Sequence, residues 1–153
     1  MRIWEWGVNM QGISVTNNKD ELLYPVDNSR EGINEKRYWI VGITLGNTDG
    51  TKTFVKRGYW EPNKSGDVVN QIGGMRAGDR IALKCQLGRG NKSISIKAIG
   101  IINDVDLNEN KVYIEWLEEF DDRNVPLRGR IKQINGPYKL SKSKNNITEV
   151  FSI

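Results

Sequence analysis

Hydrophobic residues alternate with polar ones along much of the chain, and a period of two predicts β-strands. The residues from 38 to 45, YWIVGITL, form a continuous apolar run that is typical of a central strand. Short polar connections separate the later patterns, and GRGN at 88–91 is typical of a hairpin. We therefore expect a meander of antiparallel strands. The alternating segments are 79–87, 93–102 and 111–117, the last containing Val112, Ile114 and Trp116.

Two short helices are predicted to interrupt these strands. Asp49 can cap a helix over residues 51–57, and Gly58 stands where a left-handed residue would close it. Asp67 can likewise cap a helix over 68–72. The sequence RAGD, which ends at Asp79, predicts a turn ahead of the strand 79–87. The pattern as a whole indicates a β-dominated α+β domain with short helices.

Composition narrows the classes of function. A chain of 153 residues with 37% hydrophobic and 27% charged residues is typical of one soluble domain. No apolar run approaches a membrane span, and the opening MRIWEWGVNM lacks the apolar core of a signal peptide, so we expect a cytoplasmic protein without membrane contact. A single cysteine excludes an internal disulfide and a multi-thiolate metal site.

Catalysis is not expected. Histidine is absent, which excludes histidine-based hydrolase triads and histidine-containing metal sites. The segment GNTDGTKT at 46–53 resembles a phosphate-binding loop only superficially. A Walker A loop has four residues between its first glycine and the Gly-Lys pair, whereas three separate Gly46 from Gly50, and Thr51 precedes Lys52. Carboxylate-only chemistry stays open, since it needs only Asp and Glu converging in a cleft, but an enzyme is the function class we favour least, and we predict no enzyme activity and no cofactor.

Charge is distributed unevenly. The net charge is +4, yet residues 104–122 carry −7 and residues 123–153 carry +6. A basic segment favours a polyanionic partner, although such blocks are most often solvated faces.

Several fragments occur in an order that resembles a known family. These are YWIVGI at 38–43, FVKRGYWE at 54–61, MRAGDRIALK at 75–84 and IKAIGII at 96–102. The chain from about 38 to 120 resembles the PUA-like and EVE-like β-barrel domains, most closely those at the N-terminus of McrB-type AAA+ restriction subunits. The resemblance implies an antiparallel β pseudobarrel. We expect an N-terminal extension packed on the barrel over 1–37, the DNA-binding domain over 38–138, and a C-terminal tail or linker over 139–153.

The resemblance also implies a function. In such domains an extruded, often modified, base of double-stranded DNA sits among aromatic rings, while an AAA+ GTPase motor and a nuclease lie on the same or a partner chain in a prokaryotic cytoplasm. Trp39 and Trp60 match the family's aromatic positions, accompanied by Tyr38 and Tyr59. Alternation along a strand places Tyr38 and Trp39 on opposite faces.

Basic residues complete the predicted interface, since Lys and Arg in loops can contact phosphates. Three of them, at positions 128, 130 and 132, alternate along a stretch predicted to be extended, which would place them on one face. The predicted phosphate contacts are Lys52, Lys56, Arg57, Arg89, Lys92, Arg128, Arg130 and Lys132.

Other functions remain open. A related pseudobarrel could read unmodified duplex DNA at a specific sequence, or a PUA-type module could bind RNA. An adaptor could also bind a protein through the acidic block 104–122.

Overall fold

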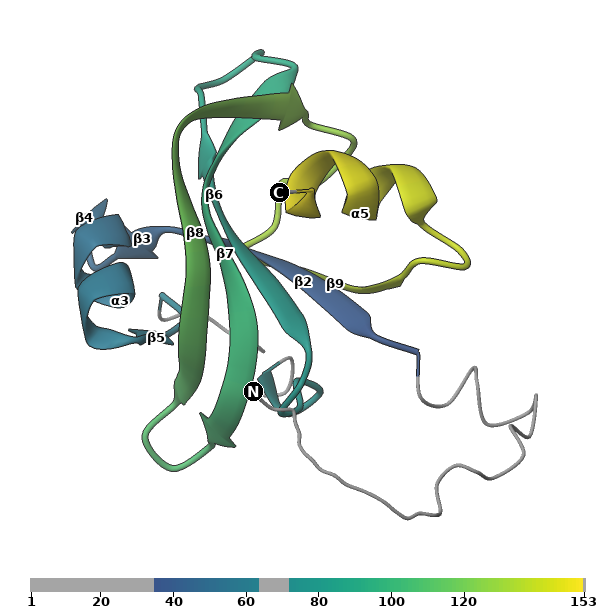
Figure 1. Ribbon diagram of the computed structural model, residues 1–153. Coiled ribbons are helices and arrows are strands. Elements are labelled where there is room, and N and C mark those ends of the chain that lie inside the picture. The colour runs from purple at the N-terminus through teal and green to yellow at the C-terminus, as the bar shows by residue number, and fades with distance from the viewer. Residues whose placement is uncertain (1–34, 64–71, 153) are drawn as a thin grey trace, which may run out of the picture. The chain divides into compact units, whose positions relative to one another are not determined.

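The computed structural model describes residues 35–63 and 72–152, in which strands dominate (Figure 1). Six strands form one sheet in the order β5-β8-β7-β6-β2-β9, and β3 and β4 form a separate hairpin. The predicted strand-dominated fold with short helices is confirmed. The elements are β2 (Arg37–Gly42), β3 (Thr44–Leu45), β4 (Thr48–Asp49), α3 (Thr51–Arg57), β5 (Tyr59–Trp60), β6 (Arg80–Gln86), β7 (Ser93–Asp106), β8 (Lys111–Pro126), β9 (Ile134–Lys139) and α5 (Lys144–Phe151).

The predicted meander is present, but the sheet is not wholly antiparallel. β6, β7 and β8 pair antiparallel in succession. β2, however, lies parallel to β6, with Trp39 opposite Ile81 and Val41 opposite Leu83. A parallel pair requires a connection that returns the chain to the same end of the sheet, and residues 43–79 make that connection. The prediction of an entirely antiparallel barrel is therefore wrong.

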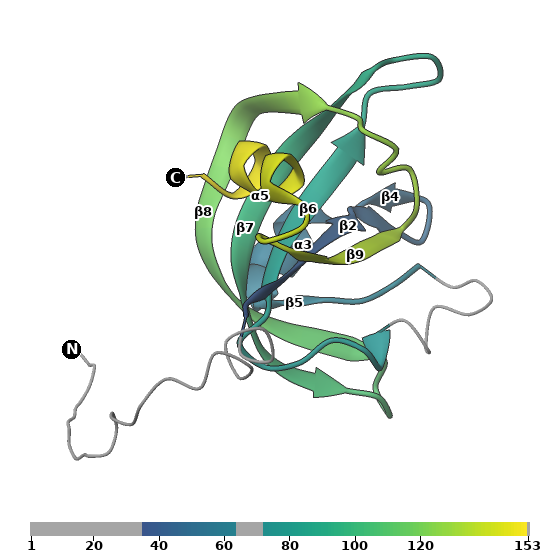
Figure 2. The same ribbon diagram turned by 90° about the vertical axis from the view of Figure 1, so that its right-hand side faces the viewer.

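β7 and β8 are longer than their hydrophobic patterns predicted. Residues 103–106, which are polar except for Val105, continue β7, so that only a tight turn separates it from β8. Three register shifts interrupt the pairing, one of them between Ile96 and Ala98. Such bulges bend a strand and increase its twist. The sheet accordingly curls into a half-barrel, which is clearest in the second view (Figure 2).

Both faces of the sheet are buried. One face packs Trp39, Val41 and Leu83 against Phe54 of α3 and Trp60 of β5. The other face lies under α5 (Figure 1). Its buried residues are Ile40, Ala82, Ile94, Ile96, Ile99 and Val125, with Val150 of α5. Residues at alternate positions of a strand therefore contribute to two separate cores.

The first predicted helix is confirmed as α3. Gly58 ends it in the left-handed conformation, with φ of +72°, and its N–H donates to Phe54 O at 2.9 Å. The N-cap of the helix is Gly50, which has no side chain to cap it, but Asp49 Oδ1 accepts a hydrogen bond from Thr51 N at 2.8 Å.

The C-terminal residues form an ordered helix instead of the expected tail. α5 buries Ile147 and Val150, and the ring of Phe151 meets that of Tyr38 edge-on at 4.9 Å. Apolar residues three and four positions apart share one face of a helix, which explains this packing. The polar run KSKNN that precedes them obscured the pattern.

Two further expectations lie outside the described residues. These are almost all of the N-terminal extension 1–37 and most of the helix expected over 68–72. Within 35–63 and 72–152, no helix combines the length and the hydropathy needed to cross a bilayer.

Candidate functional site

The turn before β6 is built around a buried carboxylate. Gly78 adopts a φ of +94°, and Asp79 N donates to Arg76 O at 3.0 Å. In return, Arg76 N donates to Asp79 Oδ2 at 3.0 Å. The same oxygen accepts the indole N–H of Trp39 at 2.9 Å and lies 3.5 Å from Arg37 Nε. The predicted turn is confirmed, and its carboxylate also fixes the orientation of Trp39.

Trp60 lies in the core. Its side chain has no exposed surface, and its Nε1 donates to Gly42 O at 2.8 Å. A ring enclosed in this way offers no face on which a base could stack. The resemblance implied a binding role for Trp60, but in this structure its side chain is buried.

The remaining aromatic candidates stabilise contacts between elements. Tyr38 packs on Phe151 across the sheet from Trp39, as alternation predicted. Tyr59 meets Phe54 edge-on at 5.5 Å, and the Lys111 ammonium lies 4.8 Å from the centre of its ring. Trp116 is half-buried and donates from Nε1 to Phe54 O at 2.9 Å, so it faces the core as its pattern indicated.

A polar cavity lies between the β3–β4 hairpin and the segment 131–133. We call it the Lys84 cavity; its volume is about 500 Å³, which lies within the range of small-molecule sites. Its lining is mostly polar and includes two lysines and one carboxylate. The lining residues are Gly42, Ile43, Thr44, Asn47, Thr48, Asp49, Asn63, Lys84, Cys85, Gln86, Ile131, Lys132 and Gln133.

Lys84 is the most unusual group in this cavity. Its side chain lies on the α5 face of β6 and is only 3% exposed. Nζ donates a hydrogen bond to Arg130 O. Burial, followed by the nearby Arg130 guanidinium, lowers the pKa of Lys84 from 10.5 to about 8. The amine is therefore a cation held in surroundings that disfavour its charge.

A second cavity shares one lining residue, Lys132, with the Lys84 cavity. We call it the Trp39 cavity; its volume is about 470 Å³. Burial raises the pKa of Tyr138, whose ring is half-buried in the wall of this cavity. The lining residues are Trp39, Gly74, Gly129, Lys132, Ile134, Asn135, Gly136 and Tyr138.

Lys132 lines both cavities. Its backbone is held by the buried side chain of Asn135, whose Nδ2 donates to Lys132 O at 2.7 Å. Asn135 Oδ1 also accepts from Lys132 N at 3.3 Å, while Nδ2 bonds to Ile40 O at 3.0 Å. Lys132 therefore has a fixed backbone and an exposed side chain at the boundary of the two cavities.

The expectation that positions 128, 130 and 132 share one face is wrong. Residues 127–133 form turns rather than an extended strand, with Arg128 at a φ of +46°. Arg130 is completely buried, and its guanidinium bonds to Glu149 Oε1 at 2.8 Å. Arg128 Nε lies 2.6 Å from the same oxygen. These two arginines attach α5 to the sheet, and Arg130 has no exposed surface with which to contact DNA.

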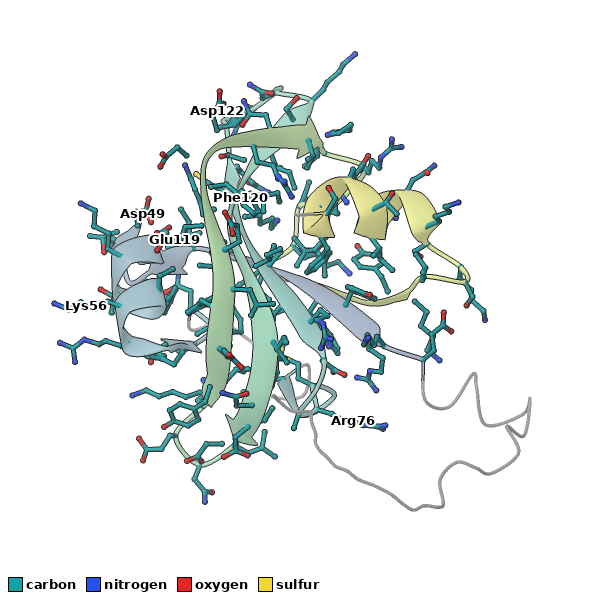
Figure 3. All side chains as sticks on the ribbon, viewed as in Figure 1. Asp49, Lys56, Arg76, Glu119, Phe120 and Asp122 are labelled. Carbon is teal, nitrogen blue, oxygen red and sulfur yellow. The ribbon has the colours of Figure 1, made fainter. Side chains whose placement is uncertain are left out.

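The other basic candidates are exposed on two separate elements. Lys52, Lys56 and Arg57 lie on α3, and Figure 3 shows Lys56 pointing outward from this helix. Arg89 and Lys92 lie on the β6–β7 hairpin. This hairpin adjoins the segment that carries Lys132, because Leu127 N donates to Lys92 O at 2.7 Å and Gln86 Nε2 donates to Ile131 O at 3.0 Å.

Sequence reasoning missed Lys84, Asn135 and the ion pairs of Glu149. Lys84 occupies a polar position in an alternating strand, which normally indicates solvent. Only the unrecognised helix α5 reveals that this face is covered. One feature of the sequence pointed weakly to Asn135: Asn-Gly-Pro is typical of a turn, and asparagine side chains in turns often bond to nearby backbone groups.

No protein-family model matches the chain, and no curated protein matches it. Among solved structures, the chain is similar to the NMR structure of Rpa0253 from Rhodopseudomonas palustris. The two share 16% identity over 74% of this chain and 92% of that chain, with a TM-score of 0.46.

Proposed function

We propose that this chain is a nucleic-acid-binding domain that recognises double-stranded DNA and has no catalytic activity of its own. One observation carries the proposal: Lys132 has an ordered backbone and an exposed side chain between two polar cavities. An ammonium in that position can pair with a phosphate, while either cavity has room for polar groups of the ligand. Arg89 and Lys92 on the adjoining hairpin extend the basic surface.

The finer assignment in this proposal is a PUA/EVE-like pseudobarrel serving a McrB-like restriction system. The curled sheet with α3 and α5 on its two faces supports it, together with the sequence fragments that resemble those domains. In this assignment the AAA+ GTPase motor and the nuclease lie on the same or a partner chain, and the complex works in a prokaryotic cytoplasm. In that complex, which would act in phage defence, this chain would determine which DNA is recognised.

Base flipping into the Trp39 cavity is the mode of recognition that we propose. The half-buried ring of Tyr138 supplies the aromatic surface there and the exposed Lys132 supplies a polar group, while Trp39 and Asn135 are buried parts of the wall. A flipped base needs both kinds of contact, because stacking replaces what the duplex loses and polar groups read the base edge. Trp60 takes no part in this proposal, since it is enclosed by the core.

A binding panel tests the proposal. Short duplexes, unmodified or methylated on adenine or cytosine, and a matched RNA would be titrated at several salt concentrations. We expect duplex DNA to bind, and log K to fall linearly with log salt, by about 0.9 for each phosphate contact. Lys132→Met should reduce that slope by about one contact. Lys97→Met on β7 is the matched control, because Lys97 lines neither cavity.

The same panel separates the alternatives. Stronger binding of RNA than of every duplex would identify an RNA-binding PUA-type module. Equal affinity for methylated and unmodified duplexes, with a strong preference for one sequence, would identify a reader of unmodified DNA. An absence of nucleic-acid binding by the folded wild-type protein would refute the proposal.

A further inference from the structure

Lys84, which lines the cavity named after it, is a buried cation without an anionic partner in the part of the chain that the structure describes. Among the described residues, Lys84 takes part in no salt bridge, and its one hydrogen bond is to the carbonyl of Arg130. Glu149 carries the nearby negative charge, but Arg128 and Arg130 already share its Oε1. Glu149 therefore pairs with the buried cation Arg130, and no carboxylate among the described residues pairs with the buried cation Lys84.

Such a charge is costly to bury, because the ammonium loses its hydration free energy. Only an anion or several hydrogen-bond acceptors can compensate for that loss. Proteins usually place an opposite charge against it. Here the space beside Lys84 is instead a cavity of about 500 Å³. The lowered pKa of Lys84, about 8, reflects the same unsatisfied charge.

Other donors line the cavity. Lys132 adds a second ammonium on its rim. Gln133 Oε1 accepts from Asn63 N, so its Nε2 points elsewhere and has no acceptor among the described residues. Asp49 also lines the cavity, but it lies on the α3 side (Figure 3), and its Oδ1 is occupied by Thr51 N. The lining therefore provides a net positive charge and amide donors.

We propose that the Lys84 cavity binds a phosphate group, with Lys84 as its buried cation and Lys132 as the cation at its rim. Lysine acts as a compact point charge for phosphate, and the amide of Gln133 can donate to a further phosphate oxygen. The phosphate has two potential sources, a nucleic-acid backbone or a free nucleotide. In the first case the inference rests on the proposed function; in the second it is independent of it.

Three probes test the inference on the full chain: inorganic phosphate, a deoxynucleoside 5′-monophosphate and a short DNA duplex. The first readout is the ¹³Cε NMR signal of Lys84 in protein labelled with ¹³C-lysine. We expect at least one probe to shift this signal saturably and to raise the pKa of Lys84, because an anion stabilises the ammonium. This measurement uses the wild-type protein and therefore does not depend on the folding of a variant.

The second readout is affinity. Lys84→Met should weaken that probe about 10- to 150-fold, the range expected for a lost charge-assisted hydrogen bond. Lys97→Met, outside the cavity, should leave the affinity unchanged within about twofold, as expected for a surface charge. Melting curves of both variants establish that they are folded at the temperature of the titration.

The outcomes distinguish the inference from the proposed function. Binding of phosphate or the mononucleotide through Lys84, without duplex binding, would support the inference and refute the DNA proposal. Duplex binding that shifts Lys84 would identify the backbone as the source. Duplex binding with no shift of Lys84, and with undiminished affinity in Lys84→Met, would overturn the inference and leave the DNA proposal standing. If no probe shifts Lys84, the inference is also overturned.

Discussion

The indole N–H of Trp39 donates to Asp79 Oδ2 at 2.9 Å, although the two residues are 40 positions apart. This bond joins β2 to the turn that begins β6. The turn carboxylate and the aromatic side chain of the proposed DNA site are thus parts of one structural unit. A change at Asp79 should therefore affect both the stability of the domain and the shape of the Trp39 cavity.

Asp79→Ala should destabilise the domain by about 2 to 3 kcal/mol, since it removes a charged acceptor shared by a buried indole and a backbone N–H. The measurement is urea unfolding at pH 7. Asp106→Ala is the control, because Asp106 Oδ1 also accepts a backbone N–H, that of Glu109 at 3.0 Å, but in an exposed turn. Its loss should stay below about 1 kcal/mol. Equal losses in the two variants would show that burial of Asp79 contributes nothing.

Trp60→Ala should cost about 3 to 5 kcal/mol, as expected when a fully buried tryptophan leaves a cavity. Any DNA affinity should then fall for all duplexes together, in proportion to the unfolded fraction. Trp116→Ala is the matched comparison, because Trp116 makes a similar N–H bond but is only half-buried, and its cost should be smaller. If the Trp60→Ala protein is folded and loses only its preference among duplexes, the result would show that Trp60 contributes to DNA recognition.

Glu149→Gln should weaken the attachment of α5. Burial would raise the pKa of Glu149, but hydrogen bonds from Arg128 and Arg130 outweigh it and lower the pKa below 4.5. The carboxylate therefore stabilises the fold above that value, and this contribution is lost as the pH falls through the folded-state pKa.

At pH 7 we expect Glu149→Gln to lose about 3 kcal/mol, because it leaves Arg130 buried without its counter-charge. The difference from wild type should shrink as the pH falls below 4.5 and through the lower folded-state pKa. Glu118→Gln, on the exposed surface of β8, should show no such difference at either pH. A constant gap at all pH values would contradict the ionic role of Glu149.

Lys84 should give a pH dependence of the same sign as Glu149, but in a higher pH window, because its folded-state pKa is also lowered. Its pKa is lowered from 10.5 to about 8, so the unfolded chain binds the proton more tightly than the folded one. The resulting penalty is fully present below pH 8 and disappears as the pH rises from about 8 to 10.5. The stability of wild type relative to Lys84→Met should therefore increase across that window. Lys97→Met should keep the wild-type slope, and a flat difference for Lys84→Met would contradict the burial of a charged amine.

The sequence predicted those helices and strands whose formation depends mainly on their own residues. Gly58 ends α3 as expected, because a left-handed closing residue is visible in the sequence itself. The alternation of Ile81 with Leu83 likewise predicted β6. The direction of β2 could not be predicted, since its apolar run is compatible with a neighbour in either orientation. Burial of Lys84 and Arg130 depends on α5, which joins the fold from far along the chain.

The candidate site shows the same contrast between residues that local signals describe and residues whose burial depends on tertiary contacts. Exposed loop cations such as Lys92 and Lys132 could be named from charge alone, because exposure there needs no partner. Trp60 and Arg130 could not be assigned correctly, since a tryptophan on a strand and an arginine near a turn are equally suited to a surface or an interior. Tertiary contacts with Gly42 and Glu149 decided both cases.

The parallel pairing of β2 with β6 has a consequence for the order in which the sheet assembles. β6, β7 and β8 are joined by short turns, so their contacts close small loops early and at low entropic cost. β2 must wait until residues 43–79 have formed their connection, and β9 can then add only to β2. We therefore expect substitutions in the β7–β8 pair to slow refolding, and substitutions at the β2–β9 contact, such as Asn135→Ala, mainly to speed unfolding.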